Sequence, residues 1–334
     1  MGRSATWECL DISKGKIIRA SISGAVSLVA IVILAMFVDV QHAIEMLSAG
    51  ASPALAFIYS LFAAGIVLVY GLRWSILLDF RLKGADAALS SLIGLGGNML
   101  LPARGGDLLR GWYSHRKASM PYSEIMSRLA VEKYVDLLTI FLIGILAGVS
   151  SSSLAVERYM LAFSTAGFIA VLAIYFMIMF FAERFLIMSH AILDWTRAPH
   201  WIRASLDSVV RDMKIKLTFS ATIIPSFLTL AMWLSLYVGS YIAIAHMVRI
   251  PLTYSEALLV LFAGALGLMI PAAPSGVGTF HASVVSAFLL LGRPASEGLV
   301  LGTAIHFLFL VTYSVPALII GSQRRVQLRL MEKK

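Results

Sequence analysis

The amino-acid sequence predicts an all-α polytopic integral membrane protein, and three features of the chain lead to this prediction. Hydrophobic residues make up 59% of the 334 residues and charged residues only 13%, which leaves too little polar surface to cover a soluble globule. Several apolar runs approach or exceed the roughly 20 residues that a helix needs to cross a bilayer. Cationic residues also alternate along the chain with segments that hold none.

The apolar runs predict about six full spans. They cover residues 17–38, 54–78, 134–149, 159–181, 219–247 and 297–320. The first run follows a group of cations, as the apolar core of a signal peptide would, but it is longer than the about 7 to 15 residues typical of a cleavable segment. We therefore expect it to be retained, and we expect a single transmembrane domain over residues 1–334.

The distribution of cations predicts the orientation of the chain, whose net charge is +9. Lys and Arg gather in residues 3–19, 73–83, 104–133, 184–216 and 324–334, whereas 39–53 and 150–157 hold neither. This positive-inside pattern is typical of a bacterial-type plasma (inner) membrane protein with both ends, 1–19 and 321–334, in the cytoplasm. The mixed segment 183–217 is expected to form helices on the cytoplasmic surface. Attraction to anionic head groups of membrane lipids accounts for the charge without a nucleic-acid partner.

A stretch rich in glycine interrupts the pattern of spans. If residues 85–101 crossed the membrane completely, the cations that follow would lie outside, against the charge rule. The segment "GLGGNMLLPARGG" also carries residues that end or break a helix. We therefore predict a broken hairpin over 85–112 that enters from the cytoplasm and returns there; a short tilted helix followed by an interfacial loop is the alternative. The residues expected to form its turn are Pro102, Gly105 and Gly106.

A second stretch, "GALGLMIPAAPSGVGTFHAS" at 264–283, has a similar order of apolar, proline and glycine residues. Topology again favours a broken hairpin, here over 254–292 and entered from the outside. Two interrupted segments that approach from opposite faces are typical of an inverted repeat around a substrate site at the middle of the membrane. Chance similarity between two apolar loops is the alternative. The residues expected to form this turn are Pro271, Pro274, Gly276 and Gly278.

The helix between the two hairpins carries a charge at every fourth position of one face: Glu124, Arg128, Glu132 and Asp136. The last two, with Lys133, are expected within the membrane, where a lipid-facing charge costs roughly 2.5 to 3.5 kcal/mol. They must therefore pair or face a cavity, and we expect Arg104 and Arg110 as their partners. A role in handling substrate and a purely structural network of ion pairs both fit this pattern.

Two further groups of residues lie in the C-terminal half. His281 and His306 would couple transport to protons if they titrate as a pair; neutral, hydrogen-bonded histidines are the alternative, and the sequence offers no further ligands for a zinc site nearby. Trp233, Tyr237 and Tyr241 form an i, i+4, i+8 stripe. This stripe suits either helix packing or the lining of a path for lipid.

Four motifs occur in a specific order and spacing: "GLRWSILL" (71–78), "NMLLPARGGDLLR" (98–110), "VEKYVDLL" (131–138) and "IPAAPSGVGTFHASVVSAFLLLG" (270–292). With them, the chain resembles the lysylphosphatidylglycerol synthase transmembrane-domain family, also described as flippase-like, over nearly its full length. The sequence departs from the family at Lys133, Ser275 and His281, where many members carry Arg, Gly and an acidic residue. The resemblance, the positions where the sequence departs from it, the charge pattern and the possible histidine pair together give these substrate-binding candidates: Asn98, Arg104, Asp107, Arg110, Glu132, Lys133, Asp136, Ser275, His281 and His306.

The resemblance implies a membrane function in lipid handling. The soluble domain of the bifunctional synthases is not part of this sequence, so we expect a transporter-like flippase that moves an anionic or aminoacylated lipid, or a lipid-linked intermediate, between leaflets. The alternatives are an intramembrane enzyme acting on a lipid phosphate or glycolipid, with Asp107 or Glu132 as general base, and an accessory subunit bound to lipid-synthesis enzymes. No nucleotide-binding loop or His-Glu zinc helix occurs in the sequence, so no cofactor or metal is expected. The oligomeric state stays open.

Overall fold

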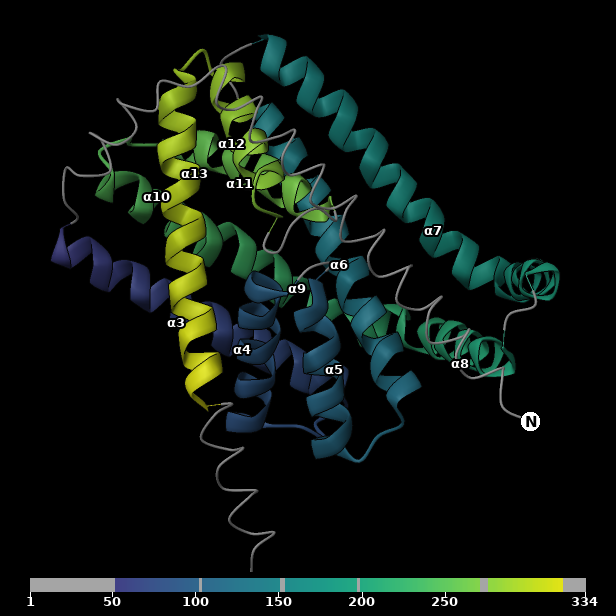
Figure 1. Ribbon diagram of the computed structural model, residues 1–334. Helices are drawn as coiled ribbons and strands as arrows, with labels where there is room; N and C mark the ends of the chain where they lie inside the picture. The colour runs from purple at the N-terminus through teal and green to yellow at the C-terminus, as the bar shows by residue number, and fades with distance from the viewer. Residues whose placement is uncertain (1–51, 102–103, 151–153, 197–198, 271–275, 321–334) are drawn as a thin grey trace, which may run out of the picture.

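The computed structural model describes residues 52–101, 104–150, 154–196, 199–270 and 276–320. Throughout these residues the regular elements are helices (Figure 1), so the predicted all-α class is confirmed. In chain order they are α3 (Pro53–Leu77), α4 (Gly84–Leu100), α5 (Gly105–Ala118), α6 (Tyr122–Val149), α7 (Leu154–Trp195), α8 (His200–Lys216), α9 (Phe219–Ala231), η2 (Met232–Tyr237), α10 (Val238–Met247), α11 (Tyr254–Met269), α12 (Thr279–Leu290), α13 (Ala295–Phe309) and η4 (Leu310–Ser314). The predicted span 17–38 and the chain ends 1–19 and 321–334 lie outside the described residues.

Four of the described helices are long and apolar enough to cross a membrane: Pro53–Leu77, Glu157–Trp195, Ala221–Met247 and Ala295–Ile320. Each overlaps a run predicted from the sequence, although Glu157–Trp195 extends well beyond the predicted end at 181. The run 134–149 forms only the second half of α6, because this helix begins at Tyr122 and carries the charged residues in its first half. The total of six spans stays a prediction.

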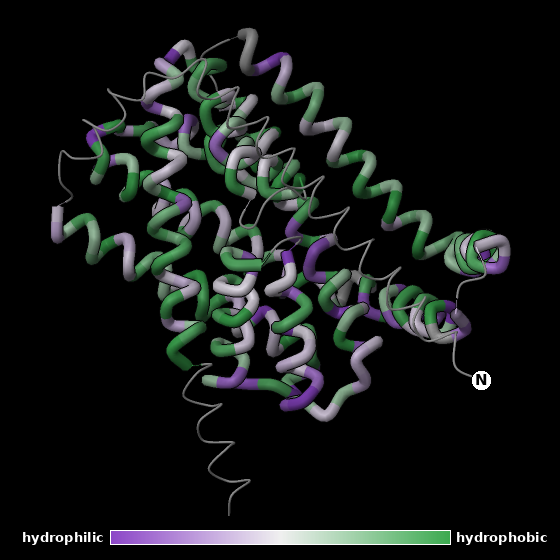
Figure 2. Tube along the Cα trace, in the orientation of Figure 1, coloured by the Kyte–Doolittle hydropathy of each residue, from purple (hydrophilic) through white to green (hydrophobic). Residues whose placement is uncertain are grey.

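Helix α7 lies along the outside of the bundle (Figure 1) and is hydrophobic over much of its length (Figure 2). In the most apolar 18-residue stretch of this helix, only 11% is buried. Such an exposed apolar surface suits contact with lipid. The helix departs from helical geometry at Phe181, where φ is −123° and ψ is 16°. The segment 183–217, predicted to form surface helices, comprises the end of α7 and the whole of α8; its position relative to a membrane stays a prediction.

The first predicted hairpin corresponds to α4 and α5, which pack against each other. With 17 and 14 residues, each is shorter than the roughly 20 residues needed for a complete crossing. Glycine allows their close approach, because a Cβ on Gly106 would collide with the backbone of Gly94 and Asn98. Pro102 lies outside the described residues, and α5 begins directly after Arg104, which has a φ of 56°.

The second predicted hairpin corresponds to α11 and α12, of 16 and 12 residues. Thr253 and Glu256 form a capping box at the start of α11, which fixes where this helix begins. Gly276 and Gly278 have φ values of 65° and 93°, which glycine adopts without the steric cost of a side chain. Pro271, Pro274 and Ser275 lie outside the described residues. In Figure 1, α4 and α5 occupy the lower half of the molecule, and α11 and α12 the upper half.

The apolar core of the described residues contains two main clusters, besides a small third one formed by α7 and α8. The larger contains Tyr70 of α3 and side chains of α10 to α13; the smaller contains Trp74 of α3 and side chains of the first half of α6. Arg73 lies between these two aromatic residues in the sequence and is fully buried. An arginine can occupy such a position only if carboxylates compensate its charge.

A cluster of charges around Arg128 joins α8 to α6 and to the end of α3. The Arg128 guanidinium contacts carboxylate oxygens of Asp79 at 3.1 Å, Glu124 at 2.7 Å and Asp212 at 3.1 Å. Lys216 contacts Asp79 at 2.9 Å. Partial burial acts to raise the pKa of the Asp79 carboxyl, but hydrogen bonds from Lys216 and Arg128 outweigh it, and the pKa is lowered.

Candidate binding site

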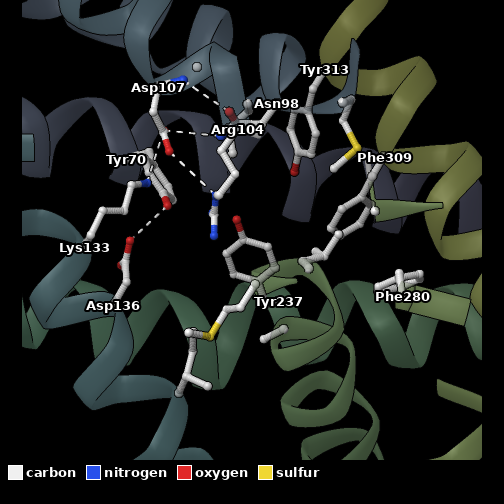
Figure 3. A pocket seen from close by; sticks show the side chains of 18 of the residues that line it. Tyr70, Asn98, Arg104, Asp107, Lys133, Asp136, Tyr237, Phe280, Phe309 and Tyr313 are labelled. Carbon is white, nitrogen blue, oxygen red and sulfur yellow. Dashed lines mark hydrogen bonds and ion pairs between the residues drawn. The ribbon is translucent and has the colours of Figure 1, made fainter. Parts of the chain in front are cut away.

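A cavity of about 420 Å³ is lined by residues of both hairpins. Leu101 and Arg104 line it from the first hairpin, and Ile270 and Gly276 from the second. Its volume falls within the roughly 300 to 1,000 Å³ typical of pockets for small ligands. One wall carries charged side chains and another carries aromatic rings (Figure 3). Two segments that are more than 150 positions apart in the sequence therefore contribute to one site.

The charged wall rests on a buried pair formed by α5 and α6. Arg110 donates two hydrogen bonds to Glu132, at 2.7 and 3.0 Å. Neither side chain is more than 1% exposed. Arg73 contacts the same carboxylate at 3.2 Å. Glu132 therefore compensates two arginines at once, and its own charge is held by both of them.

Asp136 compensates the second charge of this network. It accepts a hydrogen bond of 2.5 Å from Arg73 and one of 3.3 Å from the Tyr70 hydroxyl. Arg73 also donates to the Thr229 hydroxyl of α9 at 2.6 Å. The two arginines are thus matched by two carboxylates, so that their charges cancel, which makes their burial possible.

Aromatic rings hold the guanidinium groups in place. The Arg110 guanidinium carbon lies 4.2 Å from the centre of the Trp74 ring, and that of Arg73 lies 4.4 Å from the centre of the Tyr70 ring. The Trp74 indole in turn donates a hydrogen bond of 2.9 Å to Ser114. Cation–π contacts of this kind strengthen when water is excluded.

A second layer of charge faces the cavity (Figure 3). The Asn98 amide donates to Asp107 at 3.2 Å, and the Asp107 backbone N–H donates to the Asn98 side-chain oxygen at 3.1 Å. Lys133 contacts Asp107 at 3.2 Å and Glu132 at 3.6 Å. Arg104 approaches Asp107 only to 3.7 Å, and half of its side chain is exposed. Arg104 is therefore the least neutralised cation of this layer.

The charges in and directly behind the cavity wall do not cancel. Among the described residues they comprise four cations, Arg73, Arg104, Arg110 and Lys133, and three carboxylates, Asp107, Glu132 and Asp136. One positive charge is in excess, and it belongs to the side that is open to the cavity. Such a wall attracts an anion.

Aromatic residues line another part of the cavity. Trp233, Tyr237 and Tyr241 are each at least 91% buried, and all three line the cavity. The rings of Trp233 and Tyr237 are 4.9 Å apart. The predicted stripe therefore packs within the helix bundle and also lines the cavity, while its role as a path for lipid stays a prediction.

The two histidines of the C-terminal half lie side by side. The rings of His281 and His306 are stacked at 5.2 Å with an interplanar angle of 16°, and Phe280 contacts both. His306 is part of the cavity lining. Within the described residues no group of three or more His, Cys, Asp or Glu is arranged to hold a metal ion.

The structure thus brings most of the predicted site residues to one place. Those that line the cavity are Asn98, Arg104, Asp107, Arg110, Lys133, Asp136, His306 and the loop residue Gly276. Glu132 lies behind this wall and His281 behind His306. Of the two partners predicted for the carboxylates of α6, Arg110 binds Glu132, whereas Arg104 instead approaches Asp107. Arg104 has this different partner because it directly precedes α5 and is half exposed, whereas Arg110 lies within the helix and is buried.

Sequence reasoning missed Arg73. The charge pattern grouped it with the cytoplasmic cations of 73–83, but its side chain is fully buried and contacts Glu132 and Asp136. A signal was present in the sequence, since Arg73 is a cation within a long apolar run that continues to Leu78. A charge within such a run requires a partner.

Together, the helices and the cavity define a polytopic helical membrane protein in which two hairpins enclose a charged site. The chain belongs to the lysylphosphatidylglycerol synthase TM region family, whose sequence pattern matches residues 20–317. The chain is also similar to the glycosyltransferase AglD of Haloferax volcanii, with 27% identity over an alignment of 124 residues; the match covers 34% of this chain and 19% of that protein. No solved structure matches the chain.

Proposed function

We propose that the protein moves a lipid with an anionic head group between the two leaflets of a membrane. The observation that carries this proposal is the excess positive charge in the wall of a cavity that residues of both hairpins line. Arg104 and Lys133 would bind the phosphate. The lipid tails would remain in the bilayer, because the outer helices present apolar surface to it.

The same charge balance favours an anionic lipid over an aminoacylated one. A free amine needs an acceptor or a carboxylate, but Asp107, Glu132 and Asp136 are each engaged with a cation. An added amine would also meet the excess positive charge. We propose a plasma membrane of bacterial type as the location, with both ends of the chain in the cytoplasm, as the distribution of cations predicts.

Geometry favours binding over catalysis. A general base must be free to accept a proton from substrate. Glu132 is fully buried and held by two arginines, and Asp107 contacts Lys133 and the Asn98 amide. A carboxylate that two cations hold is a weak base. The name of the similar glycosyltransferase keeps an enzymatic role as the second candidate, to be tested in the same preparation.

The test is a translocation assay with the purified protein in liposomes that contain fluorescent lipids. An added reductant destroys the label in the outer leaflet only. Labelled lipid that moves outward therefore loses its label, and the fall in protected label measures movement. We compare wild type with Arg104→Asn and with Arg116→Asn. Asparagine is chosen because Arg104 has a positive φ, which Asn tolerates better than most residues. Arg116 lies in α5, the helix that begins directly after Arg104; it is exposed and does not line the cavity.

The expected result is faster movement of anionic lipids with wild type and Arg116→Asn. Arg104→Asn should slow it about tenfold, which equals ~1.4 kcal/mol in the activation free energy of movement. Equal rates for the two variants would show that surface attraction, not the cavity, accounts for transport. Covalent change of the lipid without movement would select the enzyme, and binding without either would select an accessory subunit.

A further inference from the structure

Helix α7 is longer than one crossing of a bilayer requires. Its apolar part, Glu157–Trp195, has 39 residues, which at 1.5 Å per residue gives a length of about 58 Å. The hydrocarbon core of a bilayer is only about 30 Å thick. Residues 157–181 alone extend over about 36 Å, so one crossing is complete where helical geometry is interrupted at Phe181. The remaining segment, 182–195, therefore lies outside the hydrocarbon core.

This end segment of α7 forms a hairpin with α8. Figure 1 shows that it runs in a different direction from the rest of α7 and lies beside α8. Ala182 and Leu186 pack against Val210 of α8. His190 Nε2 lies 2.8 Å from a carboxylate oxygen of Asp207, also on α8. The segment is thus held by α8 on one side, and its other side is uncovered.

The uncovered side of the end segment is mainly apolar. Met188, Ile192 and Trp195 are each at least 60% exposed, and their spacing of four and three positions places them on one face of the helix. Phe181 precedes Met188 by seven positions, which is about two helical turns, and is also exposed. The spanning part of α7 is apolar and exposed as well. The apolar surface therefore continues past the interruption at Phe181.

Arg184 is a cation within this apolar face. It lies four positions before Met188, is exposed, and has its guanidinium carbon 5.7 Å from the centre of the Phe181 ring. Within the described part of the chain no carboxylate forms an ion pair with Arg184, because the neighbouring Glu183 and Asp194 contact arginines of α8 instead. Its charge is therefore available to a group outside the described residues.

The chemistry of this face matches the boundary between lipid head groups and acyl chains. A helix with one apolar face and cations beside it lies in the plane of that boundary. Tryptophan is enriched there because its ring is amphipathic. An arginine next to the apolar face keeps its aliphatic stem in the acyl region while its guanidinium reaches the phosphates. In water, the same face would leave a row of large apolar side chains exposed.

We infer that the end segment of α7 is an interfacial anchor, bound to the surface of the bilayer that the spanning part of α7 crosses. Met188, Ile192 and Trp195 insert among the acyl chains, and Arg184 contacts lipid phosphates. The exposed side chains in the middle of α8 are small or polar and remain in water: Ala204, Ser205, Ser208 and Arg211.

This anchor also restrains the charged helix α6. Asp212 of α8 contacts Arg128 of α6 at 3.1 Å, and Arg128 lies one turn before Glu132. Binding of the end segment to the lipid surface therefore fixes α8 and, through α8, the helix that carries the buried carboxylates. The inference does not depend on what the cavity binds, because neither the end segment nor α8 lines the cavity.

The test measures where the end segment lies in a bilayer. Cys9 is the only cysteine of the sequence, so Cys9→Ser gives a background for single labels. Ile192→Cys and, as the control on α8, Ala204→Cys each receive a polarity-sensitive fluorophore, and the full-length protein is placed in phosphatidylglycerol–phosphatidylcholine liposomes. Nitroxide lipids labelled just below the head group or at the bilayer centre are then compared with iodide in water. We expect the label at position 192 to emit at shorter wavelength and to be quenched by the shallow nitroxide, and the label at 204 to be quenched by iodide.

A second pair of variants tests the apolar face itself. Met188→Asp places a charge on this face and should shift quenching of the label at 192 from the shallow nitroxide to iodide. Ser205→Asp adds the same charge to the exposed side of α8 and should leave the label at 192 unchanged.

Three results would overturn the anchor. Quenching at 192 by iodide in the parent protein means that the segment projects into water. Quenching mainly by the nitroxide at the bilayer centre means that it crosses the hydrocarbon core. Protection of the label at 192 from all three quenchers means that protein, such as a second copy of the chain, covers the face.

Discussion

Arg110 and Glu132 form a two-point ion pair, at 2.7 and 3.0 Å, that joins the tip-forming helix α5 to the charged helix α6. The pair is almost completely buried, and Arg73 shares the Glu132 carboxylate. The position of the first hairpin relative to the rest of the bundle is therefore tied to the charge balance of the site.

Removing one member of this pair should destabilise the protein. Glu132→Gln leaves two buried arginines with one carboxylate, and Arg110→Met leaves the carboxylates in excess; each should cost about 3 to 5 kcal/mol. The double variant keeps Arg73 with Asp136 as a balanced pair. It should therefore recover much of the loss. Thermal unfolding in detergent measures this cycle, and strictly additive losses would show that the two residues do not stabilise each other.

Lys133 should contribute to binding more than to folding. Its side chain is 30% exposed and contacts Asp107 and Glu132, so Lys133→Met should lower stability by only about 1 kcal/mol. Binding of an anionic lipid should weaken about tenfold, because the cavity loses its excess charge. Lys133→Arg restores the charge and should restore most of the affinity. Unchanged binding by Lys133→Met would place the anion elsewhere.

Gly106 should tolerate no side chain. A Cβ there collides with the backbone of Asn98 and Gly94 on α4, so Gly106→Ala should separate the hairpin helices at a cost of about 2 to 3 kcal/mol. Gly65→Ala is the control, because its Cβ meets only the flexible end of Leu236 at 3.2 Å. That change should be neutral or slightly stabilising. The melting temperatures of both variants test the hairpin packing, and equal values would contradict it.

At acidic pH, protonation of Asp79 should weaken the contact of α8 with the end of α3. Its pKa is lowered in the folded protein despite partial burial, because Lys216 and Arg128 donate hydrogen bonds to the carboxylate. The stability that Asp79 contributes is therefore complete above about pH 4, the ordinary value for aspartate, and is lost as the pH falls through the lowered pKa. Hydrogen exchange of α8 measures this opening. Asp79→Asn should exchange faster near neutral pH, and the difference from wild type should vanish in acid.

Much of the fold follows from local features of the sequence. Apolar runs predicted the membrane-spanning class, and the Gly and Pro motifs predicted the two pairs of short helices. The charges of α6 were correctly expected to find partners, and Arg110 was correctly named as one. These features are local because hydropathy and helix ends depend on neighbouring residues.

Tertiary structure alone decided which groups meet. Arg73 binds Asp136 across 63 positions and Thr229 across 156, and no sequence spacing encodes either contact. The lining of one cavity by residues of both hairpins likewise depends on how distant helices pack. The sequence determined that buried charges need partners, because an unpaired charge in an apolar medium is too costly. The packing of the helices determined which residues became those partners.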